Sequence, residues 1–201
     1  MTISDGSEMH FEPLPVAGAV LVKIEAHRDE RGFFARTFCS REFSANGLPV
    51  AVAQASISYN EHRGTVRGMH FQWPHSREDK LVRCVRGSLL DVLLDLRPQS
   101  CSYLQHCLVP LDDEQRHAVF IPHGVAHGFQ TLVANTEVLY QMTDFFAPDL
   151  GSGVRWNDSA FGIHWPLPAA RISDRDASYP DFIREQYEAE FTERQRATVR
   201  T

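Results

Sequence analysis

The stretch Gly64-Thr65-Val66-Arg67-Gly68-Met69-His70-Phe71-Gln72 decides how this chain folds. It reads as an alternating β-strand, so His70 and Gln72 have the same parity and are expected to point to one face. Arg67 has the opposite parity and shares that face only if Gly68 carries a β-bulge. Polar side chains that point into an interior are costly unless they serve a ligand. The strand therefore predicts a ligand pocket.

Further segments of the chain also read as short strands. They are rich in β-branched or aromatic residues and include 19–24, 80–85, 89–96, 118–121 and 137–142. Gly, Pro, Asn and Asp separate them, as at 97–98 and 122–124. Many short strands at regular spacing are typical of a β-sandwich or barrel, not of an alternating βαβ fold. The segment 40–46, closed by Gly47, predicts one short helix.

Length and charge limit the classes of protein to consider. The chain has 201 residues, which predicts a single domain over 1–201 with a core barrel at about 18–182. A charged, helix-permissive tail follows at 183–201, with Phe182, Tyr187 and Phe191 as candidate anchors. The formal net charge of −6 argues against non-specific nucleic-acid binding, which needs clustered Lys and Arg.

The cysteines and the apolar segments predict where the protein works. The four cysteines form no CxxC pair, so reduced thiols are expected. The apolar run at 17–22 is too short to span a bilayer and is expected to be a strand. We therefore predict a cytoplasmic protein with no nucleic-acid or membrane partner.

Tyr140 lies in another predicted strand and complements His70. A strand tyrosine usually packs in a core, but one that faces a histidine across a pocket fits two-base proton transfer. The histidine removes a proton next to a carbonyl, and the phenol returns a proton to the other face. Lys80 or His127 is expected to stabilise the enolate between the two steps. Asp176 is the candidate carboxylate that orients His70.

Two acidic residues interrupt the apolar strand predicted at 89–96. Asp91 and Asp95 are costly inside a strand unless they are paired, and an arginine such as Arg83 is the expected partner.

Several motifs occur in an order that is specific to one family. The chain resembles the dTDP-4-dehydrorhamnose 3,5-epimerase family, cupin-type enzymes that act on nucleotide-linked 4-keto-6-deoxy sugars. The resemblance runs from about 21 to 182 and implies an all-β, cupin-type jelly-roll β-barrel with a few short peripheral helices. The motifs that carry it are Arg28-Asp29-Glu30-Arg31-Gly32-Phe33-Phe34, Arg67-Gly68-Met69-His70-Phe71-Gln72, Lys80-Leu81-Val82-Arg83, Ile121-Pro122-His123-Gly124-Val125-Ala126-His127-Gly128-Phe129, Tyr140-Gln141-Met142-Thr143-Asp144 and Gly153-Val154-Arg155-Trp156-Asn157-Asp158.

The resemblance also implies roles for individual residues. It makes His70 the proton acceptor, Asp176 its carboxylate partner and Tyr140 the proton donor. Phe146 falls where the family stacks an aromatic ring, usually tyrosine, on the nucleotide base. The positions that contact the sugar and the nucleotide diphosphate are Arg31, Gln54, Arg67, Lys80, His127 and Arg175. A homodimer without a metal or organic cofactor is implied as well.

Three positions depart from the family pattern. Arg36 and Gly151 stand where the family usually has glutamate, and Ser56 stands where it usually has asparagine. These positions normally help to hold the nucleotide sugar, so the catalytic trio is intact while the nucleotide or sugar preference is expected to differ. The motifs leave open whether C3, C5 or both carbons are inverted.

Two other classes of function remain at this point. One is a metal-dependent cupin oxygenase, in which His70, His127 and Glu78 would bind the ion. Gln72 disfavours it, because metal-binding cupins usually carry a second histidine there. The other is a module that binds a nucleotide sugar without turning it over.

Overall fold

The computed structural model describes residues 8–197 and confirms an all-β chain with a few short helices. Its strands are β1 (His10–Pro13), β2 (Val20–Lys23), β3 (Ala26–Asp29), β4 (Gly32–Ala35), β5 (Gln54–Asn60), β6 (Val66–Gln72), β7 (Lys80–Arg86), β8 (Ser88–Asp95), β9 (His106–Asp112), β10 (Ala118–Ile121), β11 (Val125–Thr131), β12 (Thr136–Met142) and β13 (Gly151–Gly153). Its helices are α1 (Ser40–Ala45), the 3-10 helix η1 (Pro148–Leu150), α2 (Asp174–Ala177) and α3 (Arg184–Ala197). The helix expected at 40–46 is therefore confirmed as α1.

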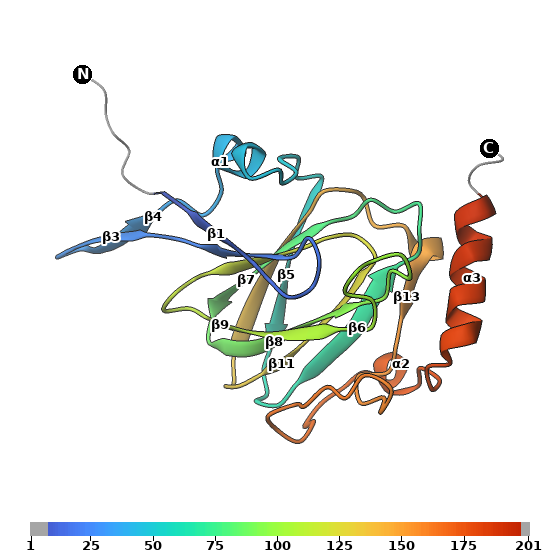
Figure 1. The fold of residues 1–201 in the computed structure, drawn as a ribbon. Coiled ribbons are helices and arrows are strands. Elements are labelled where there is room, and N and C mark those ends of the chain that lie inside the picture. The colour runs from blue at the N-terminus through green and yellow to red at the C-terminus, as the bar shows by residue number, and fades with distance from the viewer. Residues whose placement is uncertain (1–7, 198–201) are drawn as a thin grey trace.

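The strands form two sheets that face each other, and a hairpin that projects from one side (Figure 1). One sheet has six strands in the order β1-β2-β10-β7-β12-β5, and the other has five in the order β13-β6-β11-β8-β9. All the strand pairs in these two sheets are antiparallel. The hairpin consists of β3 and β4. Two facing sheets are the sandwich that the strand pattern predicts, and they have the jelly-roll form that the family resemblance implies.

The main core lies between the two sheets. Val82 and Val138 contribute from the six-stranded sheet, and Leu93 and Phe129 contribute from the five-stranded sheet. Each of these side chains is at most 1% exposed. A fully buried aliphatic or phenyl side chain stabilises the fold by about 1.5–3 kcal/mol. The sheets are therefore held together by the inward-facing alternate residues of the central strands.

The C-terminal helix covers the outer face of the five-stranded sheet. Tyr187 and Phe191 of α3 are buried in a cluster with Phe71 of β6, and the Tyr187 hydroxyl donates a 2.7 Å hydrogen bond to the Leu96 carbonyl oxygen. Two of the predicted anchors thus hold the helix in place. The last four residues of the tail lie outside the described residues, and the division into barrel and tail stays a prediction. No helix within 8–197 is long and apolar enough to cross a membrane.

Candidate active site

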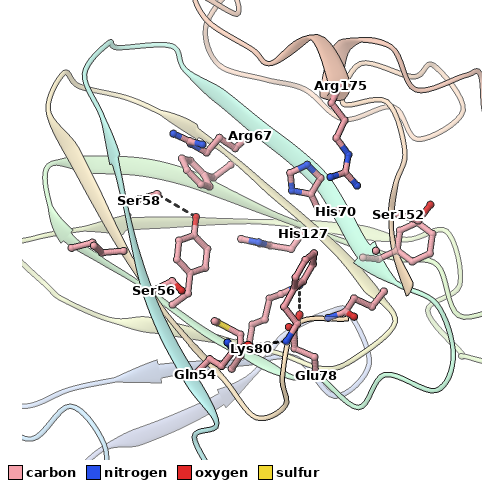
Figure 2. Close-up of a pocket in the computed structure, with 18 residues that line it drawn as sticks. Gln54, Ser56, Ser58, Arg67, His70, Glu78, Lys80, His127, Ser152 and Arg175 are labelled. Carbon is pink, nitrogen blue, oxygen red and sulfur yellow. Dashed lines mark hydrogen bonds and ion pairs between the residues drawn. The ribbon is translucent and has the colours of Figure 1, made fainter. Parts of the chain in front are cut away.

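A pocket opens between the two sheets where polar side chains replace the apolar core (Figure 2). Its volume is about 540 Å³, which is within the size range of small-molecule sites. Both sheets contribute to it, because β6 and β11 belong to one sheet and β5, β7 and β12 belong to the other. Eight of the predicted site residues line the pocket, namely Gln54, Arg67, His70, Lys80, His127, Tyr140, Phe146 and Arg175.

A β-bulge in β6 brings Arg67 and His70 to the same side. In the ladder between β6 and β11, His127 pairs with His70 but Phe129 pairs with Arg67, so β6 has one extra residue in this interval. Gly68 has a φ of +120°, and a Cβ on it would lie only 2.5 Å from the Gly128 Cα. Only glycine fits this backbone and this close approach. The bulge on which the sequence prediction depended is confirmed.

His70 is held by Asp176, which comes from the distant helix α2. The distance between His70 Nε2 and Asp176 Oδ1 is 2.7 Å, and the Gly68 amide donates to the other carboxylate oxygen. Ser173 caps α2 by accepting a hydrogen bond from the Asp176 amide, which fixes the backbone that carries the carboxylate. Burial alone would raise the pKa of Asp176, but the hydrogen bonds from His70 and Gly68 outweigh it, so this pKa lies below its usual value. Asp176 is thus an ionised partner for His70 at neutral pH.

Tyr140 enters the pocket from the opposite sheet. It lies on β12, whereas His70 lies on β6, and its hydroxyl is 3.5 Å from the Ser58 Oγ. Its ring contacts that of His127 edge to face, with the centroids 6.2 Å apart. Burial raises the pKa of Tyr140 to about 12, although the hydrogen bond with Ser58 acts in the other direction. Tyr140 therefore keeps its proton at neutral pH.

Lys80 forms an ion pair within the pocket. Its Nζ lies 3.2 Å from Glu78 Oε1, and the side chain of Glu78 is 5% exposed. Both residues line the pocket, as Figure 2 shows. Lys80 is thereby a fixed positive charge that can face a developing oxyanion.

His127 is bound to a fully buried carboxylate. Its Nε2 lies 2.6 Å from Asp91 Oδ1. Burial raises the pKa of Asp91, while His127 acts to lower it. The expectation that Arg83 would pair with Asp91 is wrong, because Arg83 donates instead to the Thr37 carbonyl oxygen. His127 and Asp91 are diagonal neighbours on β11 and β8, and this cross-strand geometry decides the pairing.

Asp95, the other acidic residue in this strand, does pair with an arginine. Its partner is Arg97, whose Nε lies 2.8 Å from Asp95 Oδ1, so the type of partner was predicted correctly but its position was not.

Two arginines at the pocket have neutral partners. Arg67 Nε donates 2.7 Å to the Asn60 side-chain oxygen, and Arg175 Nε donates 3.1 Å to the Tyr179 hydroxyl. Because these partners carry no negative charge, both guanidinium groups keep their full charge for an anionic ligand.

Gln54 connects β5 to the mouth of the pocket. Its side-chain oxygen accepts a 2.7 Å hydrogen bond from the Phe146 amide. The Phe146 ring is 58% exposed and is available as a stacking surface.

Arg31 does not lie at the pocket of its own chain. It sits in the turn between β3 and β4, forms an ion pair with Asp29, and its side chain is 86% exposed. Arg36 also lies away from the pocket and pairs with Glu42. The other two departures from the family pattern, Ser56 and Gly151, do line the pocket.

Sequence reasoning missed Ser58 and Ser152, which line the pocket, and Asn60, which binds Arg67. Ser58 and Asn60 share the parity of Gln54 along β5, so strand alternation from Gln54 was the signal that could have found these two. The possible metal ligands His70, His127 and Glu78 do not form a cluster, and no group of three or more His, Cys, Asp or Glu suited to a metal ion occurs within residues 8–197.

Comparison with known proteins gives a consistent result for sequence and structure. The family model described as dTDP-4-dehydrorhamnose 3,5-epimerase matches residues 13–184. A protein of that name from Methanothermobacter thermautotrophicus is 39% identical over 176 residues, which cover 86% of this chain and 94% of the relative.

Two solved structures have closely similar folds. NovW of Streptomyces spheroides, a 4-keto-6-deoxy sugar epimerase, superposes with a TM-score of 0.86 at 32% identity and covers 94% of this chain and 95% of its own. ChmJ of Streptomyces bikiniensis, a 3'-monoepimerase in complex with dTDP-quinovose, gives a TM-score of 0.80 at 28% identity, with 92% and 98% covered. The chain, an isomerase by this relationship, belongs to the dTDP-4-dehydrorhamnose 3,5-epimerase family.

Proposed function

We propose that this protein epimerises a dTDP-linked 4-keto-6-deoxyhexose at C3, C5 or both carbons. The observation that carries the proposal is the placement of two proton-transfer groups in one pocket. His70, backed by Asp176, comes from the five-stranded sheet, and Tyr140 comes from the six-stranded sheet. Inversion of a carbon needs a proton removed from one face and a proton delivered to the other, and groups on opposing sheets provide this.

The first step is proton removal by His70. Its Nε2 is bonded to Asp176, so Nδ1 is the ring nitrogen that accepts the proton on the carbon next to the ketone. The electron pair of the C–H bond moves into the enolate, and the carboxylate of Asp176 stabilises the imidazolium that forms. Lys80 faces the enolate oxygen and neutralises its charge, while Glu78 holds the ammonium group in position.

The second step is proton delivery by Tyr140. Because its pKa is raised to about 12, the phenol is protonated when the enolate forms. It donates its proton to the face opposite His70, and the C–H bond is restored with inverted configuration. Exchange with water then returns a proton to Tyr140 and removes one from His70.

The diphosphate and the base of the substrate are assigned to the mouth of the pocket. Arg67 and Arg175, whose recorded partners are neutral, bind the diphosphate oxygens. Phe146 stacks on the base. Ser56 and Gly151 offer smaller groups than the family's usual residues at those positions, so we expect a difference in how tightly the nucleotide is held rather than in the proton transfers.

A homodimer completes the proposal. Ile57 and Tyr59 lie on the edge strand β5 and are 61% and 51% exposed, and Phe34 on the projecting hairpin is 70% exposed. Exposed apolar residues on a sheet edge favour pairing with a second chain. The hairpin carries Arg31 away from its own pocket, so we assign Arg31 to the pocket of the partner subunit. The free state of all four cysteines supports the predicted cytoplasmic location.

The test is NMR of dTDP-4-keto-6-deoxyglucose in heavy water with the protein present. Deuterium incorporation at C3 or C5, with the appearance of the epimer, is the expected result and identifies the carbon. The same experiment with the CDP-linked sugar measures nucleotide preference. Binding of the sugar without any deuterium uptake would show a binding module instead of an enzyme.

A further inference from the structure

A second cavity lies where the loops at one end of the sandwich meet α3. Its volume is about 670 Å³, which again suits a small molecule. The lining comes from the β6–β7, β8–β9 and β10–β11 loops, with Phe191 and Gln195 from α3. None of the described residues that line it is Asp or Glu, although the chain as a whole is acidic, with a net charge of −6. The lining thus presents basic side chains and no carboxylate, while Asp95 and Asp79 lie behind it and pair with Arg97 and His123.

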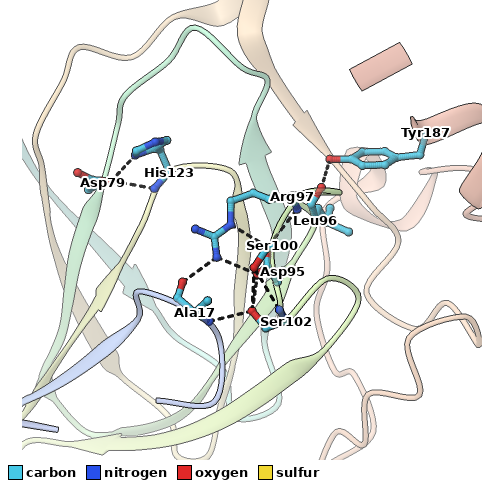
Figure 3. Close-up of polar contacts among 9 residues, drawn as sticks. All are labelled: Ala17, Asp79, Asp95, Leu96, Arg97, Ser100, Ser102, His123 and Tyr187. Atoms are coloured by element: carbon cyan, nitrogen blue, oxygen red, sulfur yellow. Dashed lines mark hydrogen bonds and ion pairs between the residues drawn. The ribbon is translucent and has the colours of Figure 1, made fainter. Parts of the chain in front are cut away.

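Three nitrogen groups are available to a ligand in this cavity. Arg77 is exposed, and its guanidinium has no hydrogen-bond or ion-pair partner among residues 8–197. Arg97 uses Nε and Nη2 to bind Asp95 and the Ala17 carbonyl oxygen, which leaves Nη1 for a ligand (Figure 3). His123 uses Nδ1 to bind Asp79, which leaves Nε2.

Two buried carboxylates hold Arg97 and His123 in position. The Asp95 carboxylate that holds Arg97 also accepts hydrogen bonds from Ser100 and Ser102, each at 2.5 Å. Asp79 accepts hydrogen bonds from both the backbone amide and the ring of His123. Arg97 and His123 are thus fixed before a ligand arrives, which lowers the entropic cost of binding.

Gln72 forms part of the wall between this cavity and the active-site pocket. It lines both cavities, it is only 8% exposed, and neither its side-chain nitrogen nor its side-chain oxygen has a hydrogen-bond partner within the described residues. A buried carboxamide without a partner is costly to the fold. Because Gln72 lines both cavities, its carboxamide is available to a polar ligand in either of them.

We propose that the second cavity binds a phosphate-bearing small molecule at a site separate from the substrate pocket. The planar guanidinium of Arg77 fits phosphate oxygens in a bidentate manner, and Arg97 adds a single contact from Nη1. In its doubly protonated form His123, whose Nδ1 is bound to Asp79, donates a third contact from Nε2. The absence of lining carboxylates removes the repulsion that an acidic protein would otherwise exert.

Inorganic pyrophosphate is the probe for this site, and titration calorimetry is the measurement. Pyrophosphate can also bind the active-site arginines, so the experiment starts from a variant with Arg67→Ala and Arg175→Ala. Binding is expected to persist in this background. Adding Arg77→Gln or His123→Gln should then weaken it by about tenfold. Arg63→Gln, an exposed arginine elsewhere, is the matched control and should leave the affinity unchanged.

The variants also separate this site from the catalytic one. Because the Arg77 side chain has no partner in the described part of the chain, Arg77→Gln should keep the melting temperature, kcat and KM of the unaltered enzyme. Loss of pyrophosphate binding in the Arg67→Ala, Arg175→Ala background would overturn the proposal, since it would locate all binding in the active site. No binding at millimolar pyrophosphate, or equal affinity with and without Arg77, would overturn it as well.

Discussion

The carboxylate of Asp176 lies 2.7 Å from the Nε2 of His70, although 106 residues separate the two in the chain. The pair places a charged acceptor at Nε2, which leaves Nδ1 as the nitrogen assigned to proton removal. This geometry orients the imidazole and stabilises its protonated form.

Asp176→Asn should therefore lower kcat by about 10²-fold or more, because it removes the negative charge that stabilises the imidazolium. Deuterium uptake at the sugar carbons measures the effect. Asp174→Asn is the matched control, since Asp174 lies on the same helix α2 and is exposed. Equal losses in the two variants would mean that the effect comes from the helix and not from the contact with His70.

Tyr140→Phe should separate proton removal from inversion. His70 remains able to exchange the substrate proton, but the donor on the opposite face is lost, so epimer formation should fall by about 10²-fold while some deuterium uptake continues. NMR of one sample follows both quantities. Tyr103→Phe removes the same hydroxyl from a tyrosine that packs in the cluster with α3, away from the pocket, and should have no effect. An unchanged rate of epimer formation in Tyr140→Phe would rule out Tyr140 as the donor.

Lys80→Met should lower kcat by about 10²–10³-fold, the usual effect of removing an oxyanion-stabilising group. KM should change much less, because the charge matters most when the enolate forms. The chain has one other lysine, Lys23, whose ion pair with Glu12 lies on the surface. Lys23→Met is therefore the control, and steady-state kinetics is the measurement. A rise in KM with kcat unchanged would assign Lys80 to substrate binding alone.

Mixing two inactive variants tests whether Arg31 serves the partner subunit. In a heterodimer of His70→Ala and Arg31→Ala chains, one site would contain both intact residues if Arg31 acts across the interface. With random exchange of subunits, activity should return to about one quarter of the unaltered level. If Arg31 acts within its own chain, every site stays defective and no activity returns.

The stability of the protein should depend on Asp176 in acid. The native pKa of Asp176 lies below its usual value, so its ionised form stabilises the fold above about pH 4, and this contribution is lost as the pH falls through the native pKa. The free energy of unfolding of the unaltered protein should therefore approach that of Asp176→Asn as the pH is lowered from about 5 to about 3. Urea unfolding at each pH gives the difference. A difference that stays constant with pH would contradict the predicted pKa shift.

Features set by local alternation were predictable from the sequence. The parity of His70 and Gln72 and the position of α1 followed from neighbouring residues alone. The shared face of Arg67 and His70 could be stated only as a condition, because a bulge depends on the register with β11.

Features that depend on distant partners were not predictable in the same way. The pairing of Asp91 with His127 requires the register between β8 and β11, which no single strand encodes. The position of Arg31 depends on the direction of the projecting β3–β4 hairpin. The family resemblance implied that Arg31 contacts the substrate but not that it lies away from the pocket of its own chain. The link between His70 and Asp176 was expected from chemistry and resemblance, since nothing local connects β6 to α2.

The glycine pair at the centre of the site has a consequence for engineering. A side chain on Gly68 would collide with Gly128, and a Cβ on Gly128 would lie 2.6 Å from the Met69 Sδ. In a saturation library, even alanine should therefore inactivate the protein at either position, although neither glycine has a side chain that takes part in the reaction. A different sandwich protein would need glycine at both of these positions, as well as the histidine and the tyrosine, to carry out the same chemistry.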